Sequence, residues 1–85
     1  MHERYENQKP DFARIRARIL QILHDDPRAY RGLTYVELGN IYYNRWKYRP
    51  TIGNRIRELR SQGLVITEMK RDLHGRERIH VFAVD

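Results

Sequence analysis

The segment from Arg49 to Val65 combines apolar residues at helical spacing with hydrogen-bonding side chains on its other sides. Ile52, Ile56 and Leu59 recur at intervals of four and three, which predicts a helix over about residues 50–62 with one buried stripe. The polar side chains around this stripe could bind base edges and phosphates, and the candidates are Arg49, Thr51, Asn54, Arg55, Arg57 and Ser61. The alternative is an exposed helix surface without a ligand.

The candidates differ in the chemistry that they offer to a nucleic acid. Asn54 can bind adenine through two hydrogen bonds, and an arginine such as Arg57 can bind guanine in the same way. Thr51 is better suited to a phosphate or to the methyl group of thymine. Arg55 and Arg60 fall on the flanks of the predicted helix, where we expect them to meet phosphate or solvent.

A second group of cations follows in the C-terminal third of the chain. Residues 64–71 and 77–84 are rich in β-forming residues and are joined by the turn-forming run DLHGR, which predicts a β-hairpin. Both faces of its second strand carry apolar groups, so the sequence leaves open which face packs inward. The side chains at or near the tip could contact phosphate or the minor groove, and they are Lys70, Arg71, His74, Arg76 and Arg78. The alternative is a charged edge that prevents sheet aggregation.

Four aromatic residues lie just before the predicted helix, at Tyr42, Tyr43, Trp46 and Tyr48. They could complete the core, form a protein interface, or stack on unpaired bases. We favour the core for Tyr42 and Trp46, whereas the sequence leaves the roles of Tyr43 and Tyr48 open. Cations alternate with these rings at positions 47 and 49, which keeps a nucleic-acid role available.

The sequence offers little support for catalysis. Its histidines are scattered, and none has a Cys, Asp or Glu at a metal-ligand spacing. The chain contains no cysteine, no glycine-rich phosphate loop and no nucleophile elbow. We therefore expect no enzymatic activity, no metal, no cofactor and no small-molecule ligand.

Size and charge define the class of protein further. With 85 residues there is room for one domain with a modest core. Seventeen Lys and Arg residues against eleven Asp and Glu residues give a formal charge of +6, which is the electrostatic signature of a nucleic-acid binder, although small basic proteins without such a partner are common. No apolar run is long enough for a membrane span, so we expect a cytoplasmic protein.

The domain that positions these groups should occupy residues 11–85, after a polar N-terminal arm at 1–10. Asp11 is a plausible N-cap for a helix that ends near His24, with Phe12 among its buried residues. A short strand is expected at 29–31. Thr34 and Glu37 have the spacing of a capping box, so a second helix should begin at Thr34 and fade near residues 43–44. Its core side is predicted to include Val36, Leu38, Ile41 and Tyr42, with Gly39 at a close helix crossing.

The run LTYVELGNIYY, followed by RPTIGNRIRELRSQGLVI, resembles the winged helix-turn-helix superfamily. Members commonly read L-T-x-x-E-L-A, then a turn, then a helix that ends in G-L-[IV]. Two departures are the longer, aromatic connection NRWKYRP and the pair Gly53–Asn54, where many DNA-binding relatives carry a small polar residue and an arginine. The resemblance implies an α+β fold in which three helices precede a two-stranded wing.

This resemblance implies double-stranded DNA as the partner and a small microbial or viral transcriptional regulator as the type of protein. If the protein is viral, it would act in the host cytoplasm. The rival hypothesis is a protein-docking module that uses the aromatic surface at 42–48. A homodimer, formed through the first helix or the hairpin, stays open as well.

Overall fold

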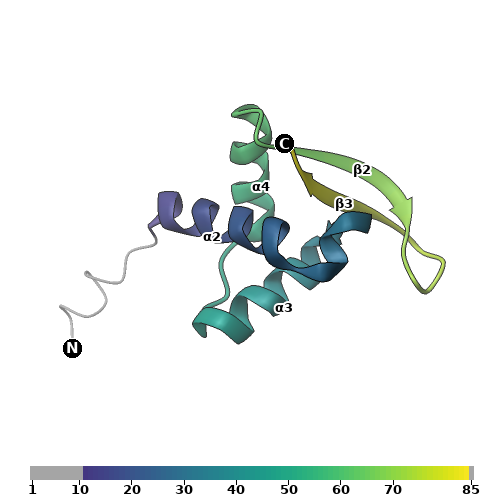
Figure 1. Ribbon diagram of the computed structural model, residues 1–85, viewed down its shortest axis with the longest axis horizontal. Coiled ribbons are helices and arrows are strands. Elements are labelled where there is room, and N and C mark those ends of the chain that lie inside the picture. Colours follow the sequence, from purple (N-terminus) through teal and green to yellow (C-terminus); the bar gives the residue numbers. More distant parts are fainter. Residues whose placement is uncertain (1–10, 85) are drawn as a thin grey trace.

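The computed structural model of the protein describes residues 11–84, so the predicted arm at 1–10 lies outside the described residues. Residues 11–84 form three α-helices, one 3₁₀ helix and three strands. In chain order these are α2 (Phe12–Asp25), η1 (Pro27–Arg31), β1 (Leu33–Thr34), α3 (Tyr35–Trp46), α4 (Ile52–Ser61), β2 (Val65–Arg71) and β3 (Glu77–Ala83). Figure 1 shows how the helices and the β2–β3 hairpin are arranged. Within residues 11–84, no helix is both long and apolar enough to cross a membrane.

The first helix, α2, begins as its sequence predicts. The Asp11 side chain accepts a hydrogen bond from the Arg14 backbone N–H at 3.0 Å, which satisfies one of the free donors of the first turn. Its buried residues are Ile15, Ile19, Ile22 and Leu23. The prediction that Phe12 is buried is wrong, because this ring is 44% exposed at the open end of the helix.

The start of α3 is a complete capping box. Thr34 accepts from the Glu37 backbone N–H at 3.1 Å, and the Glu37 carboxylate accepts from the Thr34 backbone N–H at 3.0 Å. The helix continues to Trp46, past its predicted end at 43–44, and closes at Lys47 in a left-handed conformation with φ 56°. Val36 was predicted to be buried but is 67% exposed.

Gly39 does not mark a close helix crossing. A Cβ atom built on it would lie 3.9 Å from Ile52 Cγ1 of α4, which is an ordinary van der Waals contact. The prediction from this glycine is therefore wrong.

The connection between α2 and α3 differs from the predicted strand at 29–31. Asp26 caps the 3₁₀ helix η1 through the Arg28 backbone N–H, and the strand comes later, at Leu33–Thr34. Gly32 joins the two with φ +83° and ψ 149°, a region that is almost restricted to glycine. A Cβ atom there would lie 2.7 Å from Phe82 Cζ, so the absence of a side chain lets the connection lie directly on β3.

The sheet is antiparallel with the order β1-β3-β2, so β3 is central. Leu33 pairs with Val81, and Val65 pairs with Ala83. The open question of the faces is settled by packing on both sides: Val81 belongs to the main core, whereas His80, on the other face, is covered by the Gly32 connection. Away from this region the hairpin extends from the helices (Figure 1).

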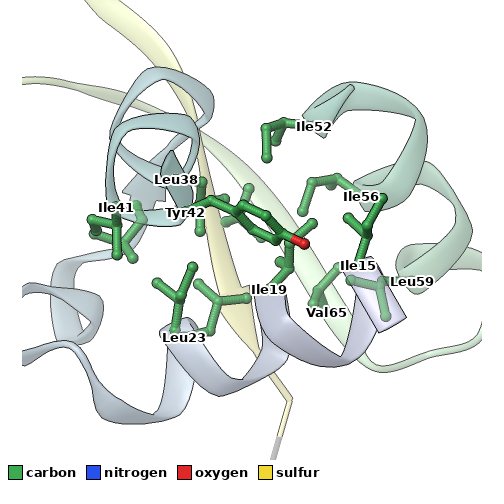
Figure 2. Packing of buried hydrophobic residues seen from close by; sticks show 13 residues of the cluster. Ile15, Ile19, Leu23, Leu38, Ile41, Tyr42, Ile52, Ile56, Leu59 and Val65 are labelled. Carbon is green, nitrogen blue, oxygen red and sulfur yellow. The ribbon is translucent and has the colours of Figure 1, made fainter. Parts of the chain in front are cut away.

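The core lies between the three helices and the inner side of the sheet (Figure 2). Tyr42 is fully buried near its centre, close to side chains from α2 and α4. Its hydroxyl oxygen accepts a hydrogen bond from Arg18 at 3.3 Å, so the buried oxygen has a partner. This core fixes α4 by the stripe Ile52, Ile56 and Leu59, as predicted.

Candidate nucleic-acid interface

The outer side of α4 is free for binding. Thr51 is the N-cap residue, and it makes no side-chain capping bond. Four of the predicted candidates are exposed, in agreement with their expected places away from the buried stripe: Thr51, Asn54, Arg57 and Ser61. The Ser61 hydroxyl donates to the Glu58 carbonyl oxygen at 3.1 Å, so its proton already has an acceptor within the helix. Asn54 and Arg57 therefore provide the most available hydrogen-bonding groups on this side.

Arg55 does not lie on the exposed flank where the sequence placed it. Its residue exposure is 6%, and its guanidinium lies 3.6 Å from the ring centroid of Phe12. It donates two hydrogen bonds of 2.8 Å to Glu58. The expectation of phosphate or solvent contact by Arg55 is corrected by this burial, because the N-terminal end of α2 covers that side of α4.

Glu58 connects two helices through two arginines. Arg16 of α2 donates to the same carboxylate at 2.8 Å. The hydrogen bond from Arg16, followed by that from Arg55, lowers the pKa of Glu58 below its ordinary value. The carboxylate is thus ionised at neutral pH and holds α2 and α4 in a fixed relation.

Asp72 organises the tip of the hairpin. Its carboxylate accepts from the backbone N–H groups of Arg76 and His74 at 2.9 and 2.8 Å, and these bonds, led by the one from Arg76, lower the pKa of Asp72. Arg78 lies 3.6 Å from the same carboxylate, and Arg71 donates to the Gly75 carbonyl at 3.1 Å. Two of the predicted contact residues thus support the turn itself.

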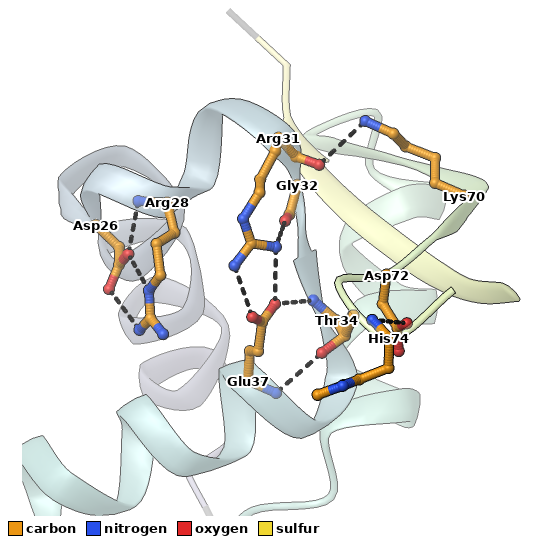
Figure 3. A network of polar contacts seen from close by, with 9 residues as sticks. All are labelled: Asp26, Arg28, Arg31, Gly32, Thr34, Glu37, Lys70, Asp72 and His74. Atoms are coloured by element: carbon orange, nitrogen blue, oxygen red, sulfur yellow. Dashed lines mark hydrogen bonds and ion pairs between the residues drawn. The ribbon is translucent and has the colours of Figure 1, made fainter. Parts of the chain in front are cut away.

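Lys70 pairs with Arg78 near the end of the hairpin, but its side chain is directed back toward η1. It is half-buried above the Phe82 ring, with 5.2 Å between its ammonium nitrogen and the ring centroid. That nitrogen donates to the Arg31 carbonyl at 3.3 Å, so Lys70 ties β2 to η1, as Figure 3 shows. The exposed side chains of His74 and Arg76 are the hairpin candidates with no side-chain partner among the described residues.

A polar network holds the start of α3 near this hairpin (Figure 3). Arg31 pairs with Glu37 at 2.8 Å, on the carboxylate that also completes the capping box. Burial acts to raise the pKa of Glu37, but the bonds from Arg31 and Thr34 outweigh it, and the pKa is lowered. The helix start is therefore held by a charged, hydrogen-bonded group.

The aromatic segment divides into a packed and an exposed part. Trp46 lies 4.8 Å from Tyr42 between ring centroids, and Arg18 stacks on Trp46 at 4.7 Å, so the preference for core positions is confirmed for Tyr42 and is consistent with a partly buried Trp46. Tyr43 and Tyr48 are 39% and 42% exposed. Both lie beside the connection that leads into α4.

Sorting the cations by their partners separates two groups. Most arginines within residues 11–84 take part in ion pairs or side-chain hydrogen bonds of the fold, including Arg60, which donates to Thr67 on β2 at 3.1 Å. Among the described residues, the exposed cations whose side chains have neither are Lys47, Arg49, Arg57 and Arg76. These four could neutralise phosphates without breaking an ion pair or a side-chain hydrogen bond of the described residues. Sequence analysis could not distinguish these four from the other cations, because many of the ion-pair and hydrogen-bond partners of the others lie on a different helix or strand.

The described residues contain no group of three or more His, Cys, Asp or Glu side chains that could hold a metal ion. An open groove of about 360 Å³ lies between the start of α3 and the hairpin, with Tyr35, Val36, Met69 and Ile79 in its lining.

Comparison with known proteins supports the fold. No family model and no curated protein matches the sequence. The structure is similar to a crystal structure from Thermoplasma acidophilum, described as a "putative transcriptional regulator", with a TM-score of 0.62 and 18% sequence identity. The match covers 82% of this chain and 69% of that one. This likeness supports the α+β fold of the described residues, three helices with an antiparallel three-stranded sheet, which is consistent with the winged-helix resemblance.

Proposed function

We propose that the protein binds double-stranded DNA sequence-specifically as a small transcriptional regulator, with α4 in the major groove and the β2–β3 hairpin as a wing on the adjacent backbone or minor groove. The observation that carries this proposal is the division of α4 into two sides. One side is fixed by the core and by the Arg55–Glu58–Arg16 pairs, and the other presents Asn54 and Arg57 without partners among the described residues. A rigid helix with free donors is what base recognition requires.

Each residue then has a specific task. Asn54 and Arg57 contact base edges, and Thr51 with Arg49 contacts phosphate near the start of α4. Arg76 and His74 meet the backbone or minor groove from the hairpin. Ser61 is a peripheral contact at the end of α4. The remaining candidates hold the fold through their own ion pairs and hydrogen bonds, and we assign no DNA contact to them. They are Arg55, Lys70, Arg71 and Arg78.

Selection of bound sequences from a random duplex library tests this proposal. We expect a defined site with an affinity of about 10⁻⁸–10⁻¹¹ M that weakens steeply with salt. Asn54→Ala should relax the preference at one base pair and cost about 1–3 kcal/mol of discrimination. Two-fold symmetry in the selected site would indicate a homodimer on DNA. Failure to enrich any sequence, with equal weak binding to all duplexes, would contradict sequence-specific recognition.

The second candidate function is protein docking through the aromatic surface at 42–48, which the exposure of Tyr43 and Tyr48 favours. A stoichiometric protein partner in a pull-down, lost in Tyr48→Ala, together with no duplex binding at physiological salt, would support it instead. In either case we place the protein in the cytoplasm of a microbial or virus-infected cell, where the proposed regulator would meet its DNA.

A further inference from the structure

A cationic aromatic surface lies at the C-terminal end of α3 and on the connection to α4. We call it the Tyr43 platform, and it consists of Tyr43, Lys47, Tyr48 and Arg49. The guanidinium of Arg49 lies 4.6 Å from the ring centroid of Tyr43, and the ammonium of Lys47 lies 5.9 Å from it. All four residues are exposed, and the connection passes from them directly into Thr51, the N-cap of α4.

Arg49 is held without being neutralised. Stacking on Tyr43 favours an orientation of the guanidinium over that ring, while no carboxylate of the described residues forms an ion pair with it. A planar, preoriented guanidinium can bind the two oxygens of a phosphate through parallel hydrogen bonds. The same stacking occupies one face of the Tyr43 ring, which leaves less of this 39% exposed ring for an apolar protein surface than its exposure alone suggests.

Lys47 occupies a position that its side chain does not favour. As the C-cap residue of α3 it has φ 56° and ψ 36°, and its backbone N–H donates to the Tyr43 carbonyl at 2.7 Å. Glycine or asparagine adopts this left-handed conformation more readily than lysine. A cation near a helix C-terminus is favourable, but Arg45 in the last turn already provides one. Capping alone therefore does not account for a lysine here.

We propose that the Tyr43 platform binds the phosphate backbone of the same duplex, just outside the bases contacted by α4. Lys47 and Arg49 contact phosphates, and Tyr43 is a positioning residue that orients Arg49. This proposal rests on the proposed DNA binding, in which Arg49 already contacts phosphate. It adds Lys47 as a second sequence-independent contact and Tyr43 as the residue that orients Arg49. The cations of the platform are stacked or unpaired and lie next to the start of α4. The duplex proposed to bind along α4 is therefore a better candidate partner for them than a separate protein.

Salt titration of duplex binding tests the platform. Using the selected duplex and a scrambled duplex, we expect Lys47→Ala and Arg49→Ala each to weaken binding about five- to tenfold on both. Each should also reduce the slope of log affinity against log salt by about 0.9, which corresponds to one lost phosphate contact. Arg14→Ala is the charge-matched control, because Arg14 is an exposed arginine on α2 whose only ion pair within residues 11–84, with Asp11, is long at 3.8 Å. It should leave the slope unchanged.

Two further variants separate binding from folding. Lys47→Gly should raise the melting temperature, because it relieves the left-handed backbone, and should still weaken DNA binding as Lys47→Ala does. Tyr43→Phe should bind like the wild type because the ring is kept, whereas Tyr43→Leu should reproduce part of the Arg49→Ala loss without a comparable loss of melting temperature.

The outcomes distinguish this inference from the function on which it rests. If Asn54→Ala changes base preference while Arg49→Ala and Lys47→Ala leave the salt slope unchanged, the platform is not a phosphate site, although DNA binding stands. If the wild type binds no duplex, both proposals fail. If Arg49→Ala leaves duplex binding intact but abolishes capture of a stoichiometric protein partner, the platform is a protein-docking surface and the inference is overturned.

Discussion

Helix α4 and the β2–β3 hairpin both carry several cations, but the two regions use them differently. The hairpin directs Lys70, Arg71 and Arg78 to carbonyl or carboxylate groups of the fold and leaves Arg76 exposed at its tip. In helix α4 two of the cations lie on different sides, because Arg55 is buried against α2 whereas Arg57 is exposed to solvent. A two-stranded ribbon has little core of its own, so polar contacts must fix its shape.

This difference assigns distinct contributions to the two regions. A helix fixed by apolar packing can leave one whole side free for recognition. A hairpin fixed by its own arginines can offer only the few side chains that remain at the tip. We therefore expect α4 to determine which sequence is bound and the hairpin to add affinity that depends little on sequence.

The largest expected effect separates Arg55 from Arg57. Arg55→Ala removes a buried guanidinium that pairs with Glu58 and covers Phe12, and it should cost about 2 kcal/mol of unfolding free energy. Arg57→Ala should change stability by less than about 0.5 kcal/mol and weaken DNA binding instead. Urea unfolding together with titration of the selected duplex measures both. Equal destabilisation by the two variants would contradict the division of α4 into two sides.

Asp72 provides the corresponding test for the hairpin. Asp72→Ala removes the acceptor of two backbone N–H groups and the partner of Arg78, and it should cost about 1 kcal/mol. The loosened tip should also weaken DNA binding to all sequences alike. Urea unfolding and binding to specific and scrambled duplexes check this, with Glu68→Ala on the exposed middle of β2 as the control. A change in base preference would show that the hairpin reads sequence after all.

A smaller effect is expected from replacing single arginines of the hairpin by alanine. Arg76→Ala should weaken binding about three- to tenfold on every duplex, because a phosphate contact is lost. Arg71→Ala removes the same charge from a side chain bonded to Gly75, so it should reduce the salt slope less than Arg76→Ala does. Salt titrations of the two variants side by side make the comparison. Identical slopes would mean that both cations reach DNA or that neither does.

The smallest effect should appear on acidification. The pKa values of Glu58 and Asp72 are lowered in the folded protein, by bonds from Arg16 and Arg55 in one case and from Arg76 and His74 in the other. The ionised carboxylates stabilise the folded protein at pH values above their pKa in the unfolded chain, which is about 4.3 for Glu and about 3.9 for Asp. This stabilisation is lost as the pH falls through their lower pKa values in the folded protein. Glu58→Gln should therefore reduce stability at pH 7 and flatten its loss below about pH 4.5. Circular dichroism across pH 2–7 measures this, and an unchanged acid profile would exclude Glu58 as a contributor.

The success of sequence analysis followed the range of the interactions. The Thr34–Glu37 capping box was predictable atom by atom because both partners lie within one helical turn. The strands end within one residue of their predicted limits because a short turn sequence fixes them. The helical spacing of Ile52, Ile56 and Leu59 also placed Asn54 and Arg57 away from the buried stripe, and both are exposed.

The errors arose where a neighbour came from a distant part of the chain. Spacing gives the direction of a side chain from its own helix but not what covers it, so Arg55 was placed on an exposed flank and Val36 in the core. Lys70 depends on the position of η1, which the sequence suggested to be a strand. Which cations lack a partner within the fold is therefore determined by the tertiary contacts, and spacing in the sequence does not reveal it residue by residue.

Gly32 has a consequence for how much variation the chain can tolerate. Its backbone angles exclude most other residues, and the Phe82 ring occupies the space that any side chain would need. In a saturation library scored for folded protein, position 32 should retain glycine almost alone, whereas nearby Tyr30, 85% exposed, should accept most amino acids. The position of the start of α3 relative to the hairpin therefore depends on Gly32, which has a hydrogen atom where every other amino acid has a Cβ atom.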